Sequence, residues 1–113
     1  MEIMVTKTAQ NEIVSQLERN HLDALKLVYD NDGCGCAVNG VVQLWMVPDE
    51  AASEAWIKAT GSTLKIMFAQ KDQIYFEERL IIDYEASGRA FILKSNNQIY
   101  NNKLNLIIRE TIQ

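Results

Sequence analysis

Apolar residues recur at helical spacing near the start of the chain and at alternating spacing through much of the remainder. Thr6-Lys7-Thr8 offers N-cap hydroxyl groups, and the chain from there to about Arg19 carries one apolar stripe. This pattern predicts an amphipathic helix that ends at Asn20-His21. Ile3 to Val5 predicts a short strand before it. The stripe consists of Ala9, Ile13, Val14 and Leu17.

Two predicted strands flank a polar, glycine-rich segment. The run from Leu25 to Tyr29 has the alternation of a strand with one well-buried face. Asp30-Asn31-Asp32-Gly33 then has the composition of a turn, because Asn, Asp and Gly tolerate left-handed backbone geometry. Val41 to Val47 predicts a buried strand, bounded by Gly40 and Pro48.

The segment from Asp49 to Ala59 has two readings. Its Ala and Glu content favours a helix, whereas Trp56-Ile57, just before the turn Thr60-Gly61-Ser62, suits the first arm of a hairpin. We expect a loop followed by a strand from Ala55 to Ala59. The second arm of the hairpin would be Thr63 to Gln70.

Short strands predicted in the second half of the chain indicate the fold class. They are separated by turns at Lys71-Asp72, Ala86-Ser87-Gly88 and Ser95-Asn96-Asn97. We therefore expect residues 1–113 to form a single domain of mainly β structure (α+β), a sandwich or open barrel with the N-terminal helix packed across it. The predicted extended segments are Gln73 to Phe76, Leu80 to Tyr84, Ala90 to Leu93 and Leu104 to Ile108.

Composition narrows the classes of partner and compartment. The chain of 113 residues has a net charge of -4, and its Lys and Arg residues are scattered singly, which argues against nucleic-acid binding. No apolar run approaches the roughly 20 residues of a membrane span, and the first residues lack the basic start and apolar core of a signal peptide. We expect a cytoplasmic protein with no membrane or nucleic-acid partner.

Both cysteines, Cys34 and Cys36, lie in the glycine-rich segment from Gly33 to Gly40. A disulfide across so short a loop would be badly strained, so we expect reduced thiols. Thiolates are soft metal ligands, and Gly33, Gly35 and Gly40 would let the backbone approach a metal closely. Two other readings stay open: a tight turn with two small, half-buried cysteines, and a thiol-redox pair.

Other polar residues near this loop have simpler explanations. Asp30, Asp32 and Asn39 could add oxygen ligands or hydrogen bonds, but turn chemistry explains them more simply. His21, the only histidine, follows the predicted helix, where we expect it to interact with the helix dipole or water. Glu77-Glu78-Arg79 is interpreted as a solvated turn.

Motifs of catalysis are missing from the sequence, and we expect no enzymatic activity. It contains no G-x-S-x-G elbow, no phosphate-binding loop and no H-E-x-x-H pair. Trp45 and Trp56 are interpreted as core residues in preference to a partner-facing patch. Asp83 and Tyr84 are expected to cap and pack.

Three segments together resemble the HesB-like, A-type iron-sulfur cluster biosynthesis proteins. Val5-Thr6-Lys7-Thr8-Ala9 resembles their opening T-x-x-A, and Gly33-Cys34-Gly35 resembles the approach to their first ligand cysteine. Leu80-Ile81-Ile82-Asp83-Tyr84, with Ser87-Gly88 and Phe91, resembles their I-D-Y segment and the strand after it. The resemblance implies a HesB-like, mostly β fold with an N-terminal helix. It also implies a role in receiving, holding or passing iron or a cluster, with assembly or recipient proteins as partners.

The chain departs from that family's pattern near its end. The carriers have a C-G-C motif there, but the segment from Ser95 to Lys103 contains no cysteine. By position Cys34 matches the first ligand, whereas Cys36 falls where glycine is usual. One chain thus offers two thiolates, whereas a [2Fe-2S] cluster usually has four thiolate ligands. A homodimer would supply four thiolates, enough for iron, a cluster or zinc. The alternative is an interaction or regulatory module that keeps the fold without a cluster.

Overall fold

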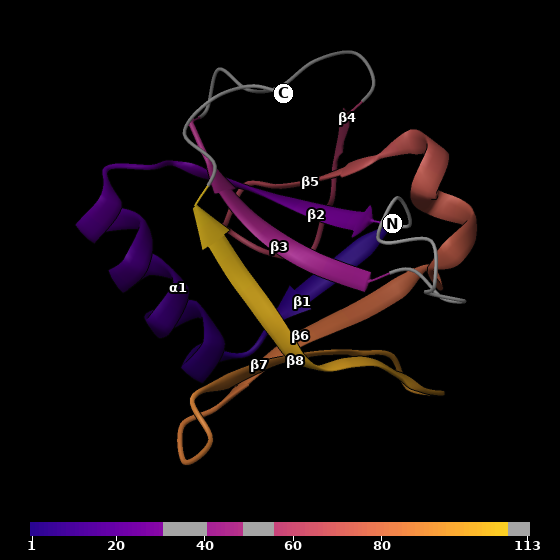
Figure 1. The fold of residues 1–113 in the computed structure, drawn as a ribbon. Coiled ribbons are helices and arrows are strands. Elements are labelled where there is room, and N and C mark those ends of the chain that lie inside the picture. The colour runs from indigo at the N-terminus through magenta and orange to yellow at the C-terminus, as the bar shows by residue number, and fades with distance from the viewer. Residues whose placement is uncertain (31–40, 49–55, 109–113) are drawn as a thin grey trace.

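One curled sheet of eight strands dominates the residues that the computed structural model describes, which are 1–30, 41–48 and 56–108 (Figure 1). The strands lie in the order β1-β6-β7-β8-β3-β2-β5-β4. This architecture confirms the predicted fold class, a mainly β structure with an N-terminal helix. The elements are β1 (Glu2–Val5), α1 (Lys7–Asn20), β2 (Ala24–Asp30), β3 (Val41–Val47), β4 (Trp56–Lys58), β5 (Ile66–Ala69), the 3-10 helix η2 (Gln70–Tyr75), β6 (Arg79–Glu85), β7 (Ala90–Lys94) and β8 (Ile99–Ile108).

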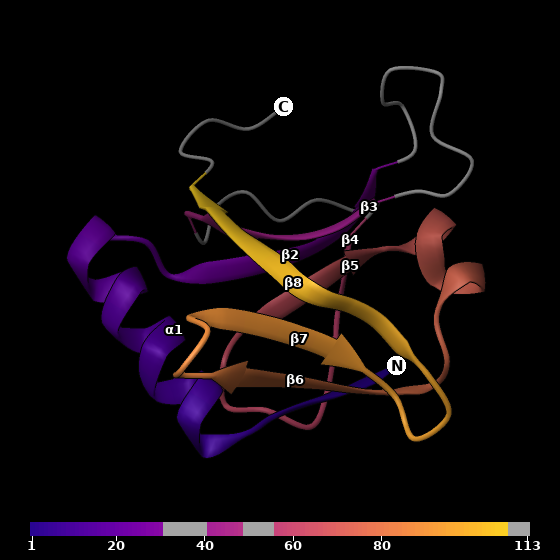
Figure 2. The ribbon, with the colours of Figure 1, turned by 60° about the horizontal axis from the view of Figure 1, so that its bottom comes forward.

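The helix α1 begins and ends where the sequence predicts. Thr6 is its N-cap, in extended conformation, and accepts a hydrogen bond from the Ala9 N–H. His21 ends the helix in the left-handed conformation at φ 57°. Both Figure 1 and Figure 2 show α1 lying along one side of the curled sheet. Its buried residues Ile13 and Leu17 enter the main core, and burial of each such side chain stabilises the fold by about 1.5–3 kcal/mol.

Strand β8 joins the two halves of the sheet. Its first part pairs antiparallel with β7, as in the pairs Ile99 with Lys94 and Leu104 with Phe91, and its last part pairs parallel with β3. Figure 2 shows the long strand crossing between the two halves. The sequence pattern predicted only Leu104 to Ile108 of this strand. The first part of the strand, residues 99–103, is mostly polar and lacks the alternation of apolar and polar residues that predicts a strand. Its register with β7 is also irregular.

The predicted hairpin of β4 and β5 is confirmed. The two strands pair antiparallel, with Trp56 opposite Ala69 and Lys58 opposite Met67. The strand reading of residues 56 to 58 is therefore correct, while residues 49–55 lie outside the described part of the chain. β2 and β3 also pair antiparallel along their whole lengths, and β5 runs parallel to β2.

The two ends of the strand order meet at a seam beside the first residues. Glu2 forms a parallel bridge with Thr60, and the Ile3 N–H donates to the Thr60 carbonyl at 2.8 Å. Gly61 follows at φ 96°, and a Cβ atom there would lie 2.7 Å from Glu2 Cγ. Only glycine takes that conformation and that contact without strain. Gly61 thus permits the close approach of β1 to the chain that follows β4.

The segment from Gln73 to Phe76 is not extended, which corrects the sequence prediction. Residues 70–75 form η2, and only then does the chain turn into β6. A strand would place Ile74 and Phe76 on the same face. In the structure Phe76 packs against the core, whereas Ile74 is 84% exposed. The tighter helix separates these two side chains and also brings Tyr75 onto Tyr29.

Both faces of the sheet are covered around β2. Leu25 and Leu27 belong to the main core, as expected, but Lys26 on the opposite face is also buried, at 4% exposure. Desolvation lowers the pKa of the Lys26 ammonium group. A second, smaller cluster of Ala24, Val47 and Met67, with half-buried Trp45 against it, lies near this lysine in the strand register.

Candidate functional site

The loop with both cysteines connects two paired strands. β2 ends at Asp30 and β3 begins at Val41, and these two residues are partners in the antiparallel ladder. Cys34 and Cys36 lie outside the described residues, as do Gly33, Gly35, Gly40, Asp32 and Asn39. Their assignment as ligands or turn residues therefore stays a prediction. The structure describes the strands on which the loop is mounted.

An aromatic cluster holds the end of β2 from which the loop departs. The rings of Tyr29 and Tyr75 stack with centroids 4.1 Å apart and an interplanar angle of 7°. Phe76 meets Tyr29 edge-on at 6.1 Å, and Tyr100 lies 5.5 Å from Phe76. Aromatic pairs in these geometries are attractive beyond their buried area. These ring contacts connect β2 to η2 and to the start of β8. The β2 residue in the cluster, Tyr29, is the last but one of that strand.

Glu77 organises the turn between β7 and β8, whereas its neighbours Glu78 and Arg79 are exposed, as expected. Its carboxylate accepts hydrogen bonds from Ser95 Oγ at 2.5 Å, Asn97 Nδ2 at 2.6 Å, Gln98 Nε2 at 3.3 Å and Tyr100 Oη at 3.4 Å. The Glu77 N–H also donates to Tyr100 Oη at 2.9 Å. These hydrogen bonds lower the pKa of the Glu77 carboxyl group. The bond from Ser95 has the largest effect, and the bond from Asn97 has the next largest.

This turn occupies the part of the chain where the carriers that the sequence resembles have their C-G-C motif. Ser95 is buried, and its Oγ also accepts from the N–H groups of Asn97 and Gln98. The donors of the turn thus converge on one carboxylate and one hydroxyl group. Sequence reasoning missed Glu77, because its partners lie 18 to 23 residues further along the chain.

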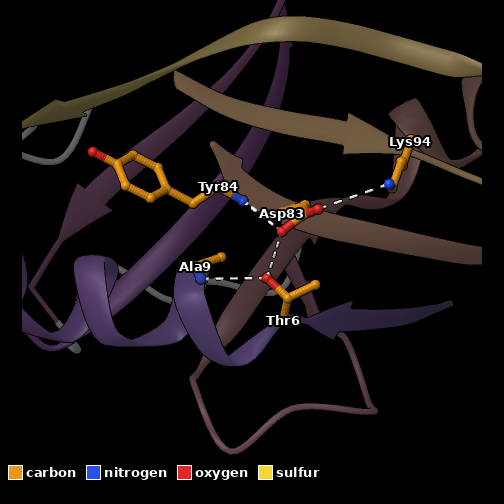
Figure 3. Close-up of polar contacts among 5 residues, drawn as sticks. All are labelled: Thr6, Ala9, Asp83, Tyr84 and Lys94. Atoms are coloured by element: carbon orange, nitrogen blue, oxygen red, sulfur yellow. Dashed lines mark hydrogen bonds and ion pairs between the residues drawn. The ribbon is translucent and has the colours of Figure 1, made fainter. Parts of the chain in front are cut away.

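A second polar cluster joins α1 to β6 (Figure 3). Thr6 Oγ1 accepts from the Ala9 N–H at 3.3 Å and donates to Asp83 Oδ1 at 2.8 Å. Asp83 Oδ1 also accepts from the Tyr84 N–H at 2.8 Å, and Lys94 Nζ lies 3.8 Å from Asp83 Oδ2. The bond from Thr6, and then that from Tyr84, lowers the pKa of the Asp83 carboxyl group.

The Thr6–Asp83 bond is structural, as expected for Asp83 and Tyr84. In Figure 3 the Tyr84 ring points away from the carboxylate, and it packs at 4.7 Å from the ring of Phe91. The T-x-x-A and I-D-Y segments, two of the three that together resemble the family, are therefore in direct contact. Their shared function in this structure is to fix the helix against the sheet.

The other predicted residues take structural positions. His21 is an exposed helix cap, and its backbone N–H bonds to the last turn of α1. Trp45 is half-buried against the smaller cluster and donates from Nε1 to Gln43 Oε1 at 3.0 Å. The Trp56 backbone lies in β4, and its side chain is outside the described part.

The described residues alone supply no metal centre. Among residues 1–30, 41–48 and 56–108 there is no group of three or more His, Cys, Asp or Glu side chains arranged to hold a metal ion. The two carboxylates with the richest hydrogen bonding, Glu77 and Asp83, have their oxygens engaged by donors. In the same ranges no helix is long and apolar enough to cross a membrane.

Comparisons with known proteins place this geometry in a family. The model of the family described as iron-sulphur cluster biosynthesis matches residues 1–108. The uncharacterized protein YqkB of Bacillus subtilis strain 168 is 28% identical over 109 residues, which cover 96% of this chain and all of YqkB.

Solved structures show the same fold at low sequence identity. A protein of Lactobacillus salivarius, proposed to act in Fe-S biosynthesis and reported with a novel fold, superposes with a TM-score of 0.78 at 13% identity, covering 98% of this chain and all of its own. A Lactobacillus acidophilus protein of the same proposed role gives a TM-score of 0.70 at 19% identity, covering 96% and 90%. The fold, the contact between the two motif segments and the match over residues 1–108 lead to one conclusion: the chain belongs to the iron-sulfur cluster biosynthesis family.

Proposed function

We propose that this protein is a non-enzymatic carrier or accessory protein of iron-sulfur cluster assembly that holds iron or a cluster through Cys34 and Cys36. Membership of the family supports a role in cluster assembly. The match over residues 1–108, which includes the cysteine loop, is the observation that carries the proposal. Iron or the cluster is the cargo here, held for transfer to a recipient protein.

The number of thiolates determines the assembly state of the loaded protein. Each chain contains two cysteines, and a [2Fe-2S] cluster is ordinarily held by four thiolates. A symmetric pair of chains with their loops facing each other would supply four. We therefore propose a homodimer in the loaded state. The same four thiolates would also suit tetrahedral zinc.

The second candidate is an interaction or regulatory module that has kept the fold without a cluster. The observation in its favour is the turn held by Glu77: the segment from Ser95 to Lys103 offers no thiol, and Glu77 engages its polar groups. Under this hypothesis the cysteines would be dispensable for partner binding. The two candidates thus differ in what cysteine substitution does.

Anaerobic reconstitution with ferrous iron and sulfide tests the proposal. The wild-type protein is expected to develop the charge-transfer absorption of a thiolate-bound cluster, and the Cys34→Ser/Cys36→Ser double variant is expected to develop none. His21→Asn is the control, because it removes the only imidazole of the chain and should leave the spectrum unchanged. Equal absorption in the cysteine-free variant, or none in wild type, would contradict the proposal and favour the module.

A further inference from the structure

A small hollow between the β6–β7 turn and β8 carries two positive charges. It has a volume of about 310 Å³ and lies between the β6–β7 turn and the middle of β8. We name it the basic hollow; its lining residues are Gly88, Arg89, Ala90, Lys103, Leu104 and Asn105. Two of the six are cations and none is acidic, although the chain as a whole has a net charge of -4. The lining is therefore cationic, with one carboxylate nearby, since Glu85 Oε1 lies 3.3 Å from where a Cβ on Gly88 would be.

The cationic groups of the basic hollow are available to a ligand. Within the described ranges neither the Arg89 guanidinium nor the Lys103 ammonium forms an ion pair or a hydrogen bond, and both residues are exposed. The acidic residue of the same turn, Glu85, accepts a hydrogen bond from Ser87 Oγ at 3.3 Å and does not line the hollow. Asn105 adds an amide group that can both donate and accept.

The backbone of Arg89 closes the β6–β7 turn, and its N–H donates to the Ala86 carbonyl at 3.3 Å. Arg89 is in the left-handed region at φ 51°, which glycine takes freely and a long side chain takes only with steric cost. Gly88, its neighbour, is not at positive φ. The turn would therefore accept glycine at this position, which makes Arg89→Gly a variant that removes the guanidinium group without straining the backbone.

We propose that the basic hollow binds a small oxyanion, a phosphate or a carboxylate group. A guanidinium group pairs with two oxygens of such a group in a fork, and an ammonium group adds a point charge beside it. The two apolar residues of the lining, Ala90 and the buried Leu104, carry no charge. The volume is at the lower end of the range for ligand sites, which restricts the ligand to a small one.

Titration of the full chain, followed by ¹H–¹⁵N NMR, tests the proposal. Inorganic phosphate and citrate are added separately, with sodium chloride keeping the ionic strength constant. We expect saturable shifts of the amides of residues 88–90 and 103–105, larger with whichever of the two oxyanions fits better. Shifts that never saturate, that centre elsewhere, or that sodium chloride alone reproduces would overturn the proposal.

Charge-removing variants locate the site. Arg89→Gln and Lys103→Gln should each weaken binding by about tenfold or more, since each removes one charged partner of the anion. Lys71→Gln is the matched control, because Lys71 is an exposed cation on η2 and does not line the hollow. Unchanged affinity in both hollow variants, or an equal loss in the control, would overturn the proposal.

Arg89→Gly separates binding from folding. Glycine relieves the left-handed strain, so the thermal midpoint should stay equal or rise by about 2–4 °C. Binding of the oxyanion should be lost in the same variant. A variant that folds well and binds as tightly as wild type would show that Arg89 is not a ligand-binding residue.

Discussion

At Thr6 one hydroxyl group makes two hydrogen bonds that the fold depends on. It accepts from the Ala9 N–H, which caps α1, and donates to the Asp83 carboxylate, which fixes the helix to β6. Thr6 and Asp83 are 77 residues apart in the sequence, so this bond is a long-range contact. Removal of the hydroxyl would leave a helix-end N–H without its cap and would take from the partly buried Asp83 carboxylate the hydrogen bond that lowers its pKa most.

The Thr6–Asp83 pair predicts coupled losses of stability. Thr6→Ala should lower the free energy of unfolding by about 1–2 kcal/mol, the usual value of an N-cap. In a double-mutant cycle with Asp83→Asn, measured by urea unfolding, the coupling should be about 0.5 kcal/mol or more. Thr8→Ala, an exposed neighbour on α1, is the control and should stay within about 0.5 kcal/mol. Strictly additive losses would contradict a direct bond.

The same carboxylate predicts a pH dependence with a definite sign. The pKa of Asp83 is lowered in the folded state, first by the bond from Thr6, so the ionised form binds better in the native protein. Its contribution is fully present above the unfolded pKa of about 3.9 and is lost as the pH falls through the lower folded pKa.

Comparison of wild type with Asp83→Asn isolates this effect from Glu77, whose pKa is lowered in the same direction. The difference in unfolding free energy between the two proteins should be constant from pH 7 to about 5 and should shrink below about 4. A difference that grows on acidification would contradict the assignment.

At the level of elements, hydrophobic periodicity was sufficient to predict a helix or strand wherever that element packs against the core by one regular face. The strand from Val41 to Val47 and the helix ending at His21 were predicted with near-correct bounds. Periodicity did not predict the backbone conformation where a few specific side-chain contacts determine it. η2 exists because Tyr75 stacks on Tyr29 while Phe76 enters the core, and a pattern of side-chain polarity does not encode such a contact.

The seam of the sheet depends on Gly61, which gives an element-level prediction. Gly61→Ala should destabilise the protein by about 2 kcal/mol or more, because the new Cβ would sit at a left-handed backbone position and collide with Glu2. Urea unfolding measures the loss.

Gly88→Ala provides a matched control in the other turn. Gly88 is not at positive φ, and a Cβ there would approach only the flexible Glu85 carboxylate, at 3.3 Å. Its effect should be within about 0.5 kcal/mol. Equal losses in the two variants would mean that the seam does not constrain Gly61.

At the scale of the whole molecule, the sequence predicted the family better than it predicted the polar clusters. Short motifs such as Thr6–Ala9 and Asp83-Tyr84 carried the family resemblance, and the structure shows them in contact. The cluster around Glu77 was not predicted, because its donors come from a later turn and meet the carboxylate only in the folded chain. Cys34 and Cys36 remain a prediction from sequence.

In the proposed homodimer, two copies of the cysteine loop hold one cluster. Native mass spectrometry of anaerobically reconstituted protein tests it most directly, since it reports the number of chains and the mass of bound iron and sulfide together. The account predicts a dimer that carries about one [2Fe-2S] cluster, and cluster-free chains for the Cys34→Ser/Cys36→Ser variant. A wild-type protein that stays free of iron, or a cysteine-free variant that loads equally, would contradict it.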